Sequence, residues 1–127
     1  MSNVLIIDDD KVFRASLSKM FEKAGYMTMT ASDGEEGVNL FSTLGFDLVI
    51  TDIIMPVMEG IETILTLRTI NPELKIIAMS GGGKVSAEEY LNTARLLKVN
   101  AILKKPFSFK ELQEVLEGLK KTRSHIS

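Results

Sequence analysis

The chain has 127 residues, a net charge of −2 and no cysteine, which fits one domain and excludes a disulfide framework or a thiolate metal site. The slight acidity argues against nucleic acid as the main partner, because phosphate binding needs a basic face. The sequence shows no signal-peptide pattern and no apolar run near the ~20 residues that span a bilayer, so we expect a cytoplasmic protein without a membrane partner.

Strand and helix patterns alternate through the first half of the chain. Residues 4–7 are apolar at every position, which predicts a strand covered on both faces. Apolar residues then recur with a helical period over residues 13–24, and residues 27–31 alternate as an edge strand does. The helical period returns over residues 37–44, and residues 48–50 form a second continuous apolar strand.

The alternation continues through the second half of the chain. Helical stripes over residues 61–65 and 87–94 flank a third continuous apolar strand at residues 76–79. Residues 101–103 form a short apolar run that two lysines follow, which is typical of an edge strand. A last helical stripe covers residues 112–119.

This alternation, with short connections, predicts a parallel sheet with helices on both faces. Gly25, Gly45, Asn71 and Asn100 follow helical stretches, and each accepts the left-handed conformation that often ends a helix. The edge-like second and fifth strands fit the strand order 2-1-3-4-5 that is known from flavodoxin-like folds, and we therefore expect an α/β, doubly wound fold of this kind with five strands and five helices. Residues 1–127 are predicted to form one domain with its core over about 3–121.

The first, third, fourth and fifth strands would be neighbours in this order, and residues with reactive side chains follow each of them. In doubly wound sheets, ligands bind outside the carboxyl ends of the strands. These residues are Asp8, Asp9 and Asp10 after the first strand, Asp52 after the third, Ser80 after the fourth, and Lys104 and Lys105 after the fifth. We therefore expect a carboxylate cluster, a hydroxyl and an ammonium to converge on one small pocket.

This set of side chains suits phosphoryl chemistry. Clustered carboxylates repel one another, and a hard cation such as Mg²⁺ relieves that repulsion with oxygen ligands. Asp52 could attack phosphorus as a carboxylate nucleophile, while the metal and Lys105 neutralise charge on the transferred group. The Ser80 hydroxyl could donate to a phosphoryl oxygen. Asp10 is better interpreted as the N-cap of the following helix.

Four motifs resemble the receiver domains of bacterial two-component response regulators. The motifs occur in the family's order and spacing and cover nearly the whole chain, which starts at Met1 and resembles a stand-alone, chemotaxis-regulator-like receiver. They are Ile6-Ile7-Asp8-Asp9-Asp10, Asp52-Ile53-Ile54-Met55-Pro56 with Gly60, Ala78-Met79-Ser80, and Lys105-Pro106-Phe107.

The resemblance implies that Asp52 is the phosphoacceptor. It also implies that Asp8 and Asp9 hold Mg²⁺ with Asp52, and that the backbone carbonyl of Ile54 is a further ligand. The phosphoryl donor in this family is a phosphohistidine on a histidine kinase or a phosphotransfer protein. The phosphorylated domain then changes conformation and signals to a downstream protein, so we expect a signalling phosphoacceptor that catalyses only its own phosphorylation and dephosphorylation.

The resemblance also covers the switch region, with two departures, one at Ile102 and one in residues 81–86, a stretch that looks longer and looser than is usual in the family. Ser80 matches the family's switch hydroxyl and Lys105 its lysine, whereas Lys104 does not match. Ile102 stands where receivers often carry an aromatic residue, so the family's usual aromatic output route does not carry over directly. Ile54 and Gly82 stand where receivers often orient the hydrolytic water, so we expect slow dephosphorylation.

Two other functions are compatible with the sequence. An Asp-x-Asp after an apolar strand also occurs in haloacid-dehalogenase-type phosphohydrolases, where Asp8 would be the nucleophile and Asp10 the general acid. The chain is short for that fold, and Asp52 would then have no role. The second alternative is a receiver-like interaction module that takes no phosphoryl group.

Overall fold

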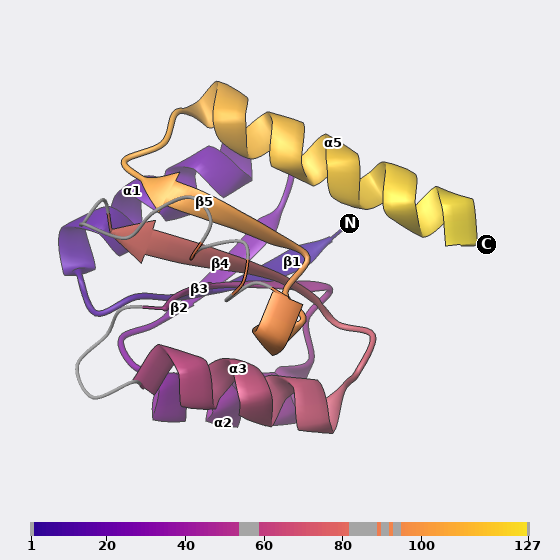
Figure 1. Ribbon diagram of the computed structural model, residues 1–127. Helices are drawn as coiled ribbons and strands as arrows, with labels where there is room; N and C mark the ends of the chain where they lie inside the picture. The colour runs from indigo at the N-terminus through magenta and orange to yellow at the C-terminus, as the bar shows by residue number, and fades with distance from the viewer. Residues whose placement is uncertain (1, 54–58, 82–88, 90–91, 93–94, 127) are drawn as a thin grey trace.

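The computed structural model describes residues 2–53, 59–81, 89, 92 and 95–126. The sheet is parallel, with the strand order β2-β1-β3-β4-β5 that the sequence predicted (Figure 1). The strands are β1 (Asn3–Ile7), β2 (Met27–Ala31), β3 (Leu48–Asp52), β4 (Lys75–Gly81) and β5 (Ala101–Lys105).

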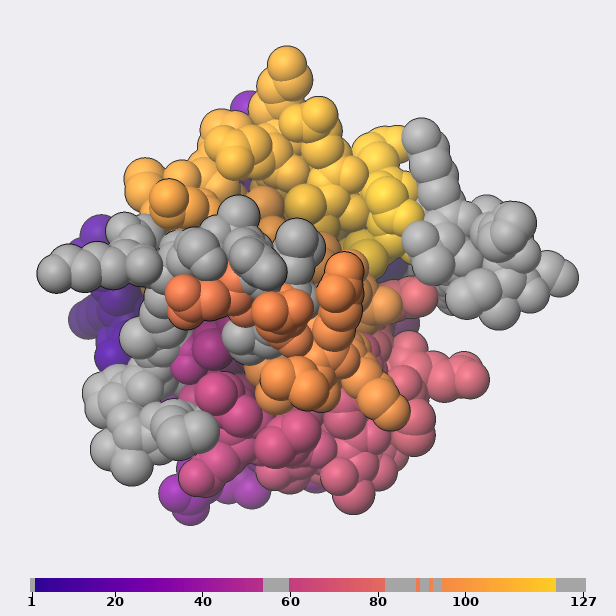
Figure 2. Space-filling view, in the orientation of Figure 1, coloured from indigo at the N-terminus to yellow at the C-terminus, as the bar shows by residue number. Residues whose placement is uncertain are grey.

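Helices cover both faces of this sheet. In Figure 1, α1 (Lys11–Lys23) and α5 (Phe109–Ile126) lie on one face, and α2 (Gly34–Leu44) and α3 (Glu59–Ile70) lie on the other. The space-filling view shows the same division, with α5 in yellow at the top and α3 in magenta at the bottom (Figure 2). The fourth predicted helix, over residues 87–94, falls largely outside the described residues. In the described part of the chain, no helix is long and apolar enough to cross a membrane.

Each continuous apolar strand contributes side chains to two hydrophobic cores, one on each face of the sheet. Val4 and Ile6 of β1 pack with α1 and α5, whereas Leu5 and Ile7 pack with α2 and α3. This division follows from the two-residue period of a strand, which sends successive side chains to opposite faces. All four side chains are fully buried, as expected for an interior strand of a parallel sheet.

Helix ends follow local side-chain chemistry. The Asp10 side chain accepts hydrogen bonds from the backbone N–H groups of Val12 and Phe13, so its predicted role as an N-cap is confirmed. Gly25 and Gly45 adopt the predicted positive φ angles, 93° and 73°. Before β4 and β5, however, the predictions for Asn71 and Asn100 were wrong, because neither residue has a positive φ.

The left-handed residue before β5 is Lys98, with φ 57°. Asn100 instead uses its side chain, whose Oδ1 accepts a hydrogen bond from the Ile76 N–H at 2.8 Å. That bond fixes the start of β4 against the turn that leads into β5. The role of Asn100 is therefore the hydrogen bond that its side-chain amide accepts. The left-handed backbone conformation occurs two residues earlier, at Lys98.

Two leucines on the predicted apolar stripes are exposed. Leu44 is 56% exposed at the last residue of α2, and Leu65 is 50% exposed on α3. On α3, the buried side is centred on Thr63, Ile64 and Leu67 instead. Leu65 lies about 100° around the helix from Ile64, so it falls at the flank of the covered face.

Candidate functional site

The candidate site lies at the carboxyl ends of β1, β3, β4 and β5. In the sheet register, Ile7 is opposite Thr51, Asp52 is opposite Met79, and Gly81 is opposite Lys105. Strand ends that are level in this way place the residues after them side by side. The topology therefore brings together residues that are up to 97 positions apart in the sequence.

Three carboxylates form the centre of the site. Asp8, Asp9 and Asp52 each offer one oxygen atom, and these atoms all lie within 4.8 Å of one another. Asp8 and Asp52 are buried, at 0% and 5% exposure, whereas Asp9 is exposed. The Asp10 N–H donates to Asp8 Oδ1 at 2.8 Å, which holds the Asp8 carboxylate in place.

Lys105 joins the two buried carboxylates. Its Nζ donates to Asp8 Oδ2 at 2.5 Å and to Asp52 Oδ2 at 2.8 Å. Burial by itself would lower the pKa of Lys105, but the hydrogen bonds and negative charges of Asp52 and Asp8 outweigh burial and raise that pKa. Lys105 is therefore firmly protonated at neutral pH. Its neighbour Lys104, which does not match the family's lysine, is exposed.

Ser80 is the last buried residue of β4 and lies opposite Lys104, the residue before Lys105, in the sheet register. Ser80 is fully buried, and its Oγ has no hydrogen-bond partner within the part of the chain that the structure describes. An unpaired buried hydroxyl is unfavourable by about 1–3 kcal/mol, so a hydroxyl kept in such a position fits a group that bonds to a ligand.

The donor set fits a hard divalent cation. Three carboxylate oxygens close together offer the oxygen ligands and negative charge that Mg²⁺ prefers, and the described part of the site contains no soft sulfur ligand. The fourth predicted ligand, the Ile54 carbonyl, lies outside the described residues, as does Gly82. Ile102 is partly buried and packs against the core on the α2 and α3 face.

Gly60 lets the start of α3 lie directly against the end of β3. A Cβ atom at this position would come closer to the backbone of Asp52 and Ile53 than real Cβ atoms do. Any side chain would therefore push α3 away from the strand end that carries Asp52. The sequence motif includes this glycine but does not reveal the close approach.

Two further neighbours of the site were not predicted. The Arg14 guanidinium donates to the backbone carbonyl of Asp8 at 2.6 Å. Phe13 was predicted only as a core residue of its helix, but its ring lies 4.3 Å from the Lys105 ammonium. The only signal for either residue was its place one turn after the aspartates, at the start of α1.

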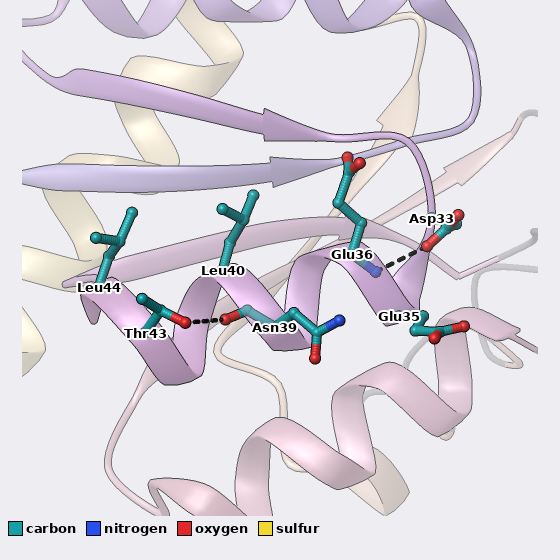
Figure 3. Close-up of a pocket in the computed structure, with 7 residues that line it drawn as sticks. All are labelled: Asp33, Glu35, Glu36, Asn39, Leu40, Thr43 and Leu44. Atoms are coloured by element: carbon teal, nitrogen blue, oxygen red, sulfur yellow. Dashed lines mark hydrogen bonds between the residues drawn. The ribbon is translucent and has the colours of Figure 1, made fainter.

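A separate hollow lies along α2, away from these strand ends (Figure 3). Two of its polar side chains are already bonded within the helix, because Asp33 accepts from the Glu36 N–H and Thr43 donates to the Asn39 carbonyl. We therefore assign no chemistry to it. Its lining residues are Asp33, Glu35, Glu36, Asn39, Leu40, Thr43 and Leu44.

Known proteins share both this sequence pattern and this fold. Residues 4–117 match the family model of the response regulator receiver domain. The chain is 34% identical over 119 residues to the response regulator receiver protein CpdR of Brucella abortus. The matched region covers 94% of this chain and 97% of CpdR. The solved structure of chemotaxis protein CheY4 of Vibrio cholerae is similar, with a TM-score of 0.82, 29% identity, and coverage of 92% of this chain and 97% of that chain. The structure of TrrA of Thermotoga maritima in complex with Mg²⁺-BeF has a TM-score of 0.80 and 30% identity, with 94% and 99% coverage.

Proposed function

Because the chain belongs to the receiver domains of two-component response regulators, we propose that it signals by accepting a phosphoryl group on Asp52. Receiver domains are signalling proteins rather than classical enzymes, and they receive phosphoryl groups from histidine kinases or phosphotransfer proteins. The observation that carries the proposal for Asp52 is its buried carboxylate, bonded to Lys105 at 2.8 Å beside Asp8 and Asp9.

The proposed step is an exchange of one bond to phosphorus for another. A carboxylate oxygen of Asp52 attacks the phosphorus of a phosphohistidine, and an acyl phosphate forms. The P–N bond breaks, and the imidazole nitrogen leaves with the electron pair and takes up a proton. The chain thus promotes its own phosphorylation, while the donor protein supplies the activated phosphoryl group.

The surrounding residues would stabilise charge during this step. Lys105 already holds its ammonium group at Asp52, so it can pair with oxygens of the incoming group. The buried Ser80 hydroxyl gains a partner if it donates to a phosphoryl oxygen. Bound Mg²⁺ would supply further positive charge, and Asp8, Asp9 and Asp52 would hold it together with the Ile54 carbonyl.

The partners follow from this chemistry. We propose a histidine kinase or phosphotransfer protein as the donor, and a downstream protein that distinguishes the phosphorylated from the unphosphorylated domain. We also propose, from the sequence, that the exchange takes place in the cytoplasm. The TrrA complex with Mg²⁺-BeF supports a site of this kind, because beryllium fluoride can occupy the place of a phosphoryl group on a carboxylate.

The proposal is tested with acetyl phosphate and Mg²⁺, followed by intact-mass measurement. We expect the native chain to gain one phosphoryl group that is lost in hydroxylamine, as acyl phosphates are. Asp52→Asn should gain none, because an amide is a poor nucleophile at phosphorus. Asp10→Asn is the matched control and should be labelled, because that side chain caps α1.

Two results would contradict the proposal. Equal labelling of Asp52→Asn would remove Asp52 from the role of acceptor. Steady hydrolysis of a small phosphate ester that survives loss of Asp52 would favour the phosphohydrolase, for which Asp8 is the candidate nucleophile.

A further inference from the structure

The Lys105 ammonium has a third neighbour besides its two carboxylates. Its Nζ lies 4.3 Å from the centroid of the Phe13 ring, within the range of a cation–π contact. The same atom is 2.5 Å from Asp8 Oδ2 and 2.8 Å from Asp52 Oδ2. The charge therefore lies between an aromatic face and the carboxylate that is the proposed phosphoacceptor.

The Phe13 ring is held in place by groups that do not belong to the carboxylate cluster. The backbone N–H of Phe13 donates to the side chain of the N-cap Asp10 at 3.1 Å, and this bond fixes the first turn of α1. Its ring meets the Phe107 ring edge to face, with centroids 5.9 Å apart at 82°. Phe107 is buried and lies two residues after Lys105, so the segment that carries the lysine also orients the ring beneath it.

A ring face holds a cation differently from a carboxylate. A hydrogen bond to Asp8 or Asp52 fixes the ammonium at one oxygen, whereas attraction to the ring quadrupole has little preferred direction across the face. During transfer, the ammonium must shift from carboxylate oxygens toward the oxygens of the arriving group. A ring that keeps the cation close through this shift favours the transition state.

We propose that Phe13 is a positioning residue for phosphoryl transfer, holding the Lys105 ammonium beside Asp52 through its ring face. This inference rests on the proposed function of Asp52. It assigns to Phe13 a role that its place on the apolar stripe of α1 does not require, since Leu or Met would fill the same stripe.

The test measures the rate of phosphorylation by acetyl phosphate at saturating Mg²⁺ in a series of variants at position 13. Phe13→Leu removes the ring face, and Phe13→Tyr keeps it. Phenylalanine carrying one, two or three ring fluorines keeps the shape and progressively weakens the attraction. We expect a roughly three- to tenfold lower rate for Phe13→Leu, a graded fall with fluorination, and a near-native rate for Phe13→Tyr.

Two controls separate positioning from packing. Phe21→Leu removes another ring of α1, one that packs edge to face on Tyr26, and it should lower the melting temperature without changing the rate. In a Lys105→Ala background, fluorination at Phe13 should no longer change the rate, because the cation is gone. A fluorine effect that persists without Lys105 would mean that the ring acts through packing, and it would overturn the inference.

The remaining outcomes are also distinct. A native chain that gains no phosphoryl group would contradict the proposed function itself. A native chain that is labelled at Asp52, with equal rates for all fluorinated rings, would leave that function standing and overturn the role of Phe13. Fluorinated variants retain the ring and its packing, so this comparison holds even if Phe13→Leu fails to fold.

Discussion

Asp8, Asp9 and Asp52 bring three carboxylates together, and the Lys105 ammonium is bonded to two of them. Lys105 forms its hydrogen bonds with Asp8 and Asp52, and Asp9 remains exposed to solvent. Like charges at this spacing destabilise the folded state unless a cation offsets them. The folded state should therefore bind Mg²⁺, while the unfolded chain separates Asp52 from the adjacent Asp8 and Asp9 and should not.

We expect Mg²⁺ to stabilise the fold. A ligand that binds only the native state adds roughly 2.7 kcal/mol at a hundredfold excess over its dissociation constant. The melting temperature should rise with Mg²⁺ at fixed ionic strength, and Asp9→Ala should remove most of that rise. Glu35→Ala deletes the same charge on α2 and should respond as the native chain does. An equal rise in Asp9→Ala would place the cation elsewhere.

Tyr26 links stability to alkaline pH. Its ring packs edge to face on Phe21, and burial, with a smaller effect of the Asp47 charge, raises the pKa of its hydroxyl. The folded state therefore keeps this proton at pH values where the unfolded chain, with a tyrosine pKa of about 10, loses it. The contribution of Tyr26 is present in full below that pH and is lost as pH rises through the folded-state pKa.

We expect Tyr26→Phe to reduce the fall of the free energy of unfolding above about pH 10. Lys105, whose pKa is also raised, should account for part of the fall that remains. Tyrosinate absorbance in Tyr90→Phe, which leaves Tyr26 as the single tyrosine, should titrate above the ordinary value. Titration at or below the ordinary value would contradict this expectation.

At the scale of elements, Arg68 ties three segments together at the end of the sheet opposite the candidate site. From α3 it donates five hydrogen bonds of 2.5 to 3.3 Å to the segment before β4 and the turn before β5. Burial lowers the pKa of its guanidinium. The acceptors are the backbone carbonyls of Pro72, Leu74 and Lys98 and the side-chain oxygen of Asn100.

Arg68→Met should lower the free energy of unfolding by about 2–3 kcal/mol, because it leaves several carbonyls without their charged donor. Arg68→Lys should restore little of this, since an ammonium cannot reproduce the planar set of five donors. Urea unfolding measures the loss, and Arg95→Met, at an exposed position, is the control. Phosphorylation of Asp52 should continue in the folded variant. A loss below about 0.5 kcal/mol would show that water replaces the guanidinium.

At the scale of the whole molecule, the strand order and the meeting of Asp8, Asp52 and Lys105 could be predicted because both depend on where the strands lie and end. Fully apolar runs predicted interior strands, and parallel strands place the residues after them at one edge. Asp8, Asp52 and Lys105 therefore meet as expected, although they are far apart in sequence.

The contacts that could not be predicted depend on side-chain direction or on backbone acceptors. The stripe containing Phe13 indicated a buried face but not the ammonium that the ring contacts. Apolar spacing did not reveal which flank of α3 is covered, so Leu65 was placed inside and lies outside. Arg68 bonds mainly to backbone carbonyls, which leave no mark on the residue types around them.

The most direct test of the central claim is to locate the phosphoryl group itself. Borohydride reduces an aspartyl phosphate to homoserine, so peptide mass spectrometry of the reduced protein identifies the residue that carried it. After treatment with acetyl phosphate and Mg²⁺, we expect homoserine at position 52 in the native chain and at no position in Asp52→Asn. Homoserine in place of Asp8 or Asp9, or its absence from a chain that has gained phosphoryl mass, would contradict the assignment of Asp52 as the acceptor.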